Sequence, residues 1–105
     1  MSDMGTELTI TNIDGGFRLD GEVDAQTAPS LKSCLETYLN DSDGVTLDVR
    51  EVTFMDSSGL RVLLGVTETC RAQGSDLELV APTPTVSRLF DISGLAGHFT
   101  VTPAG

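Results

Sequence analysis

The chain has 105 residues, the size of one domain with a single core, and its 39% apolar and 21% charged residues are typical of a folded globular protein. Its apolar runs all fall short of the ~20 residues that a membrane-spanning helix needs. Six basic residues stand against sixteen acidic ones, and the formal charge of −10 repels phosphate backbones, which argues against direct nucleic-acid binding. The N-terminus lacks the basic start and apolar stretch of a secretory signal, so we expect a cytoplasmic protein and, by default for a small acidic domain, a monomer.

The periodicity of apolar residues divides the chain into eight elements. Alternation at every second residue predicts strands, and apolar residues at i, i+3 and i+4 predict helices. In chain order these are a strand at 7–13, a strand at 17–21, a helix at 27–39, a strand at 45–49, a helix at 58–72, a strand at 77–81, a short helix opening at 82–85, and a strand at 98–102. A hairpin followed by alternating helices and strands predicts an α/β sheet with helices packed mainly on one face. We expect one domain over residues 7–105, after a flexible segment at residues 1–6.

Capping residues mark the ends of the predicted helices. Thr27 is able to cap the first helix, and either Thr83 or Thr85 is able to cap the third. Gly74 and Gly94 follow the second and third helices, where a glycine commonly adopts a left-handed conformation.

The two cysteines, Cys34 and Cys70, lie on the apolar stripes of predicted helices. Neither belongs to a CxxC pair or has a histidine close by in the sequence, so the pattern of a metal site is missing. We expect both to be buried, reduced thiols that act as small apolar side chains. No cofactor motif is present, and we expect neither a metal nor a cofactor.

The stretch Asp56-Ser57-Ser58-Gly59 lies between a predicted strand and a predicted helix. The first N–H groups of a helix have no partner within it, and its dipole is positive at this end, so binding sites of α/β proteins are common here. A purely structural interpretation is that Asp56 or Ser57 caps the helix and that Gly59 allows close packing.

Two catalytic interpretations of this stretch fail on the residues. A serine hydrolase needs a base, but the single histidine, His98, lies near the C-terminus and no G-x-S-x-G motif is present. A nucleotide-binding loop needs more glycines than Gly59 and usually a lysine, and the carboxylate of Asp56 would repel an anion. We therefore expect no enzymatic activity and no catalytic residue.

A third interpretation makes Ser57 an acceptor of phosphate. A hydroxyl on an exposed turn is able to enter another protein's nucleotide site, and a phosphate adds a charge of about −1.5 to −2 with three strong acceptor oxygens. The helix N-terminus tolerates that anion, so the fold need not rearrange. A partner surface built for a neutral hydroxyl would instead meet charge next to Asp56. The switch would therefore act on binding.

Three blocks of the sequence resemble the anti-sigma factor antagonists, the stand-alone STAS domains of bacteria. "FMDSSGLRVLLG" at 54–65 is similar to their signature, and "GEVD" at 21–24 to an early Gly-Glu-apolar-Asp motif. "PTVSRLFDISGL" at 84–95 is similar to their third-helix motif. The blocks occur in the family's order, and the resemblance extends from about Leu8 to Val101.

This resemblance implies a mixed sheet of four to five strands flanked by helices, and a regulatory role. The partner in the family is an anti-sigma factor, typically a GHKL-type kinase, which phosphorylates the serine after the motif's aspartate, here Ser57. The unmodified antagonist binds that kinase and frees a sigma factor, and a PP2C-type phosphatase reverses the modification. By the same resemblance Asp24, Asp56, Ser58 and Gly59 lie with Ser57 in or beside the partner-binding surface.

Some features leave alternatives open. Asp24 is also interpretable as an exposed acid that caps the first helix, and Glu22 as a solvated charge at a strand end. Arg61 stands where close relatives often have a small residue, and the sequence stops at Gly105 without the extra C-terminal helix of many members. The alternative function is a STAS scaffold subunit of a stressosome-like or transporter complex that no kinase modifies.

Overall fold

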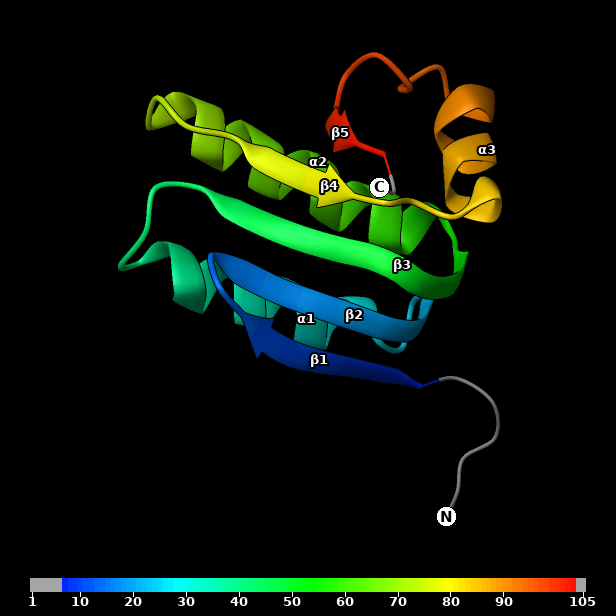
Figure 1. The fold of residues 1–105 in the computed structure, drawn as a ribbon, viewed down its shortest axis with the longest axis horizontal. Helices are drawn as coiled ribbons and strands as arrows, with labels where there is room; N and C mark the ends of the chain where they lie inside the picture. The colour runs from blue at the N-terminus through cyan, green and yellow to red at the C-terminus, as the bar shows by residue number, and fades with distance from the viewer. Residues whose placement is uncertain (1–6, 104–105) are drawn as a thin grey trace.

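The computed structural model describes residues 7–103, which form one sheet of five strands and three helices (Figure 1). The strands are β1 (Leu8–Ile13), β2 (Gly16–Val23), β3 (Val45–Met55), β4 (Leu77–Val80) and β5 (Thr100–Thr102). The helices are α1 (Ala28–Leu39), α2 (Ser57–Ala72) and α3 (Pro84–Ile92). The expected flexible segment at residues 1–6 lies outside the described residues.

The strands lie side by side in chain order, from β1 at one edge to β5 at the other. β1 pairs antiparallel with β2, and every following pair is parallel. The expectation of a mixed α/β sheet is confirmed. Because β2 and β3 are parallel neighbours, their carboxyl ends lie side by side at the same end of the sheet.

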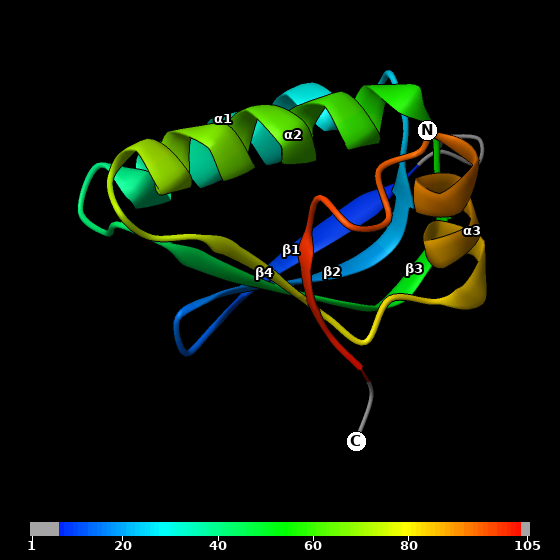
Figure 2. The same ribbon diagram turned by 90° about the horizontal axis from the view of Figure 1, so that it is seen from above.

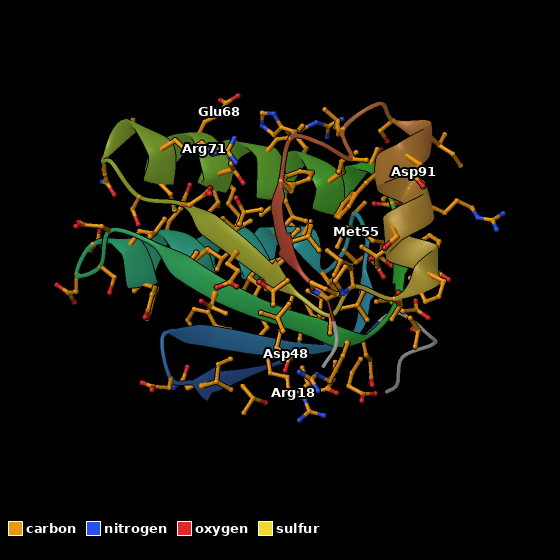
Figure 3. The ribbon with its side chains drawn as sticks, turned by 45° about the horizontal axis from the view of Figure 1, so that its top comes forward. Arg18, Asp48, Met55, Glu68, Arg71 and Asp91 are labelled. Atoms are coloured by element: carbon orange, nitrogen blue, oxygen red, sulfur yellow. The ribbon has the colours of Figure 1, made fainter. Side chains whose placement is uncertain are left out.

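Helices α1 and α2 lie next to each other over one face of the sheet, as Figure 2 shows, and α3 packs near the carboxyl end of β3. The core between these layers is made of fully buried leucines and valines, among them Leu19, Leu31, Leu47, Leu63 and Leu79. Removing such side chains from water is the main stabilising term of a domain of this size. The other face of the sheet is polar: Arg18 and Asp48 lie on it (Figure 3). The prediction that helices cover mainly one face is confirmed.

The strand β3 is longer and less regular than its sequence predicts. Alternation holds for the buried residues Val45, Leu47 and Val49, and then buried residues follow only at every third position, at Val52 and Met55. The pairing with β2 explains this, since β3 carries one extra residue at each of two shifts in register. Bulges of this kind bend a strand and redirect its side chains. The bulged end of β3 leads directly into the Asp-Ser-Ser-Gly stretch.

Capping residues at the start of the helices and glycines after their last turns lie largely where the sequence predicts them. Gly74 and Gly94 have φ of 82° and 75°, left-handed values that favour glycine. The side chain of Thr83 caps α3 by accepting from the N–H of Val86, which decides between the two threonines. The prediction that the side chain of Thr27 caps the first helix was wrong. Thr27 occupies the N-cap position of α1, but its hydroxyl donates to the carbonyl of Glu22 at 2.8 Å.

Three smaller expectations also need correction. Ala81 lies beyond the end of β4 with φ of 58°, so it does not continue the strand. The last strand begins at Thr100, since His98 belongs to the preceding loop, where its N–H bonds the carbonyl of Leu95. Cys70 is buried as predicted, but Cys34 is only half-buried.

Candidate functional site

The carboxyl ends of β2 and β3 place two acidic residues next to each other. Val23 pairs with Met55 at the last position of the two parallel strands, and Asp24 and Asp56 follow them. The N–H of Asp56 donates to the carbonyl of Val23 at 3.1 Å, which links the two chain segments directly. Asp24 leads into α1 and Asp56 into α2. Residues more than thirty positions apart in sequence therefore share one end of the sheet.

Asp56 is the N-cap of α2. It has an extended backbone, with φ of −115° and ψ of −169°, and its Oδ1 accepts from the N–H of Ser58 at 2.8 Å. Its carbonyl accepts the helical bond from Leu60 at 3.1 Å. Capping side chains of this type stabilise a helix by about 1 kcal/mol. Of the two capping residues that the sequence allowed, the structure selects Asp56, and α2 begins one residue earlier than predicted, at Ser57.

Asp24 organises the turn before α1 in a similar way. Its Oδ1 accepts from the N–H groups of Gln26 at 2.9 Å and Thr27 at 3.1 Å. The N–H of Asp24 in turn donates to the hydroxyl of Thr27 at 2.9 Å. Both N–H groups belong to residues before Ala28, the first residue of α1, so this carboxylate holds the turn and Thr27 occupies the N-cap position. The interpretation of Asp24 as an exposed acid that caps the first helix was therefore wrong. The half-buried side chain also lies beside the start of α2, because Val23 and Met55 are paired.

Ser57 differs from both aspartates because its side chain faces solvent. It is the first residue of α2, it is exposed, and its hydroxyl makes no hydrogen bond with another described residue. Ser58, in contrast, is half-buried and faces α1. The turn thus presents one free nucleophilic hydroxyl on a backbone that the cap of Asp56 holds in place.

Gly59 explains how the turn comes so close to the sheet. A Cβ on this buried residue would lie 2.6 Å from Cγ1 of Val23 and 2.8 Å from Cγ of Met55. Contacts that short do not occur between real side chains, so a larger residue would push the first turn of α2 away from the strand ends. The structure gives Gly59 a packing role, and that packing fixes the position of Ser57.

A groove of about 850 Å³ lies between α1 and α2. The two helices start from parallel strands, so both N-termini lie at the same end of the groove. At that end Lys32 of α1 and Arg61 of α2 stand on opposite walls, and Ser58 also lines the groove. The sequence did not predict this pair of cations, because their proximity depends on how the helices pack.

Cation placement is notable in so acidic a chain. Three of the six basic residues, Arg18, Arg50 and Arg71, form ion pairs with carboxylates. Within residues 7–103, Lys32 and Arg61 make no ion pair, although Glu36 lies one turn beyond Lys32 in the same groove. The site therefore has an acidic side at the strand ends and a basic side in the groove.

The single histidine lies away from Ser57. Arg71, near the end of α2, donates to the carbonyl of His98 at 2.9 Å, and the ring of His98 packs edge-on against Phe99. With a rise of about 1.5 Å per residue, Arg71 lies roughly 20 Å along α2 from Ser57. The structure does not bring a histidine base to the candidate site.

The cysteines and acids also lack the arrangement of a reactive or metal-binding site. Burial raises the pKa of the Cys34 thiol, and burial together with the charge of Asp76 raises the pKa of Cys70, so both thiols stay protonated at neutral pH. Within the described residues no three His, Cys, Asp or Glu side chains are grouped to hold a metal ion. In the same residues no helix has the length and apolar character to cross a membrane.

The sequence and the fold are those of a known family. The sequence model of the STAS domain matches residues 6–104, and the chain belongs to the STAS domain family. The anti-sigma-B factor antagonist of Listeria monocytogenes is 42% identical to it over 78 residues, which are 72% of this chain and 68% of that protein. The family resemblance drawn from the motifs is confirmed.

Solved structures agree with this assignment. An anti-sigma factor antagonist from Mycobacterium paratuberculosis matches with a TM-score of 0.78 and 27% identity, over 93% of this chain and 86% of that one. The Bacillus cell fate determinant SpoIIAA in its phosphorylated form matches with a TM-score of 0.70 and 22% identity, over 94% of this chain and 92% of that one. The second likeness is one of fold alone.

Proposed function

We propose that this STAS domain is an anti-sigma factor antagonist whose binding is switched by phosphorylation of Ser57. In the unmodified state it binds an anti-sigma factor and thereby releases a sigma factor. Phosphate on Ser57 ends that binding. The names of its relatives and the three sequence motifs support the proposal. Its location would be the cytoplasm, where sigma factors act.

The observation that carries the proposal is the exposed hydroxyl of Ser57 at the first position of α2, which makes no hydrogen bond within residues 7–103. The cap and the packing of the turn depend on Asp56 and Gly59, and neither needs that hydroxyl. A phosphate there would change the surface charge while leaving the core contacts intact. The switch would therefore alter binding and not folding.

The proposed docking surface consists of Asp24, Asp56, Ser57 and Ser58, with Gly59 as its packing base. The partner would be a GHKL-type serine kinase that supplies ATP and magnesium, and a PP2C-type phosphatase would remove the phosphate. Since the partner must accept Ser57 in its own catalytic cleft, its surface fits a neutral hydroxyl. A phosphate that costs about 3 kcal/mol at such an interface lowers affinity more than a hundredfold.

The test is to incubate the chain with its cognate anti-sigma kinase and ATP, and to map phosphate by mass spectrometry. Phosphate should appear on Ser57, be absent from Ser57→Ala, and persist in Ser58→Ala, which keeps the acceptor hydroxyl. Titration calorimetry should show that Ser57→Ala binds as the unmodified chain does, while Ser57→Asp binds more weakly. One carboxylate reproduces the charge of a phosphate only in part, so the phosphoprotein should bind most weakly.

Equal affinity of the unmodified chain, Ser57→Asp and the phosphoprotein would contradict the switch. Modification missing from Ser57, together with tight binding to a larger complex, would favour the scaffold alternative.

A further inference from the structure

Arg61 lies one helical turn beyond the proposed phosphate acceptor. Ser57 is the first residue of α2 and Arg61 the fifth, so the two side chains are i and i+4 on one face of the helix. Their Cβ atoms are then about 5–6 Å apart, within reach of an arginine side chain. Both residues are exposed, so neither needs to leave a packed position to meet the other.

The order and chemistry of the pair are favourable for contact. An anion at i and a cation at i+4 is the better order for such a pair on a helix, and a phosphate at the first position also meets the positive end of the helix dipole. The planar guanidinium donates two parallel N–H groups, which match the oxygens of a phosphate. Within residues 7–103 Arg61 makes no ion pair that would have to break first.

Other charges near Ser57 are less suited to this role. The carboxylate of Asp56 accepts from Ser58, that of Asp24 accepts from its own turn, and both would repel a phosphate, as would Glu22 at the end of β2. On α1, which packs beside α2, Lys32 and Glu36 lie on the opposite wall of the groove. Arg61 is the cation on the acceptor's own helix face.

We propose that Arg61 holds the phosphate of phosphorylated Ser57. The inference rests on the proposed function, since it concerns the state that the switch produces. Arg61 also lines the groove between α1 and α2. When its guanidinium turns toward the phosphate, a cation is therefore taken away from the groove. Phosphorylation thereby changes the surface at two places, adding negative charge at the turn and removing positive charge from the groove.

The test uses phosphoserine installed at position 57 during translation, so that no kinase is needed. Phosphorus NMR then gives the second pKa of the phosphate as pH is varied. A nearby cation favours the dianion and lowers that pKa, so Arg61→Met should raise it by about half a pH unit. Arg61→Lys should restore part of the shift, because it keeps the charge without the fork of donors.

Arg88→Met is the matched control, because Arg88 is an exposed cation on α3 without an ion pair among the described residues. It should leave the phosphate pKa within about 0.1 unit of the parent, as a distant exposed charge is screened. Lys32→Met should shift it less than Arg61→Met. An unchanged pKa in Arg61→Met, or an equal shift in Lys32→Met or Arg88→Met, would overturn the role of Arg61.

This result is separable from the kinase assay of the proposed function. A shift confined to Arg61 variants would stand even if no kinase modified Ser57, in which case only the proposed switch would fail. Efficient phosphorylation of Ser57 with a phosphate pKa independent of Arg61 would leave the switch in place and remove Arg61 from it.

Discussion

The two ends of α2 hold their polar residues in different ways. In Figure 3 the label Met55 marks the neighbourhood of the first end, and Arg71 marks the other. At the start, the side chain of Asp56 bonds the backbone of its own turn, and buried apolar contacts position the helix. At the far end, Arg71 donates to the carboxylate of Asp76 at 3.0 Å, and that carboxylate also accepts from the hydroxyl of Thr100. Side chains from three segments thus fasten the far end to the sheet edge.

This difference separates structural charge from charge available to a partner. The ion pair of Arg71 and its bond to the carbonyl of His98 are used within the chain. Among the residues that the structure describes, Ser57 and Arg61 belong to no such network, because capping and close packing already secure the start of α2. A surface that must bind and release a partner requires side chains that, like Ser57 and Arg61, are not already used in bonds within the chain.

Replacing Gly59 by alanine should produce the largest loss of stability. The new Cβ would lie 2.6 Å from Val23 and 2.8 Å from Met55, so the first turn of α2 must shift. Overpacking of this kind costs about 2 kcal/mol, to be measured as the free energy of unfolding in urea. The matched control is Gly65→Ala in the same helix, where a Cβ has nothing within 4 Å.

Gly65→Ala should stabilise the chain by about 0.5–1 kcal/mol, because alanine loses less backbone entropy in a helix. If Gly59→Ala were as harmless as Gly65→Ala, close packing would not be what holds the start of α2.

Breaking the network at the far end should have a smaller effect. Asp76→Asn removes the ion pair with Arg71 and weakens the bonds from Thr100 and Leu77. The side chain of Asp76 is 38% exposed, so solvent screening limits the loss in the free energy of unfolding to about 1 kcal/mol at neutral pH. Asp91 on α3 is exposed and its side chain bonds no other described residue, so Asp91→Asn should change stability by less than about 0.5 kcal/mol.

The loss at Asp76 should depend on pH in a defined direction. The hydroxyl of Thr100, with the N–H groups of Arg71 and Leu77, lowers the pKa of Asp76 below its usual value. The folded state therefore binds this proton less readily than the unfolded chain does, and stability is gained above the ordinary pKa of about 3.9 and lost as the pH falls through the lower folded value. The difference between the parent and Asp76→Asn should shrink in urea titrations repeated toward pH 3. A constant difference would show that the bonds of Asp76 do not depend on its charge.

Local patterns in the sequence predicted most of the fold. Alternation located the strands, and the glycines at positions 74 and 94 located two helix ends, because each signal depends on residues close by in the chain. The bulges of β3 were not predictable in this way, since they arise from pairing with β2, which lies more than twenty residues earlier. The hydroxyl of Thr27 was misjudged for a different reason: its partner, the carbonyl of Glu22, is close in sequence but belongs to the end of β2, and a helix-capping pattern considers only the residues of the helix.

The candidate site was predictable where one short stretch defines it. The stretch from Asp56 to Gly59 indicated a capped helix start with an exposed hydroxyl, and the structure places Ser57 accordingly. The groove with Lys32 and Arg61 was not predictable, because it forms only when two helices from parallel strands pack side by side. Long-range packing, and not local propensity, decides which charges lie near the serine.

The smallest expected effect on stability is at the proposed switch itself, at the start of α2. Ser57→Ala removes a hydroxyl that is exposed and bonds no described residue, so the free energy of unfolding should change by less than about 0.5 kcal/mol. Ser57→Asp adds an anion at a helix N-terminus, which should stabilise the chain by about 0.3–1 kcal/mol at low salt, less the repulsion from Asp56. Both are measured by urea denaturation beside Gly59→Ala. A loss of 2 kcal/mol or so in Ser57→Ala, as large as that expected for Gly59→Ala, would mean that the hydroxyl supports the fold, and a residue that the fold requires could not be freely modified by a kinase.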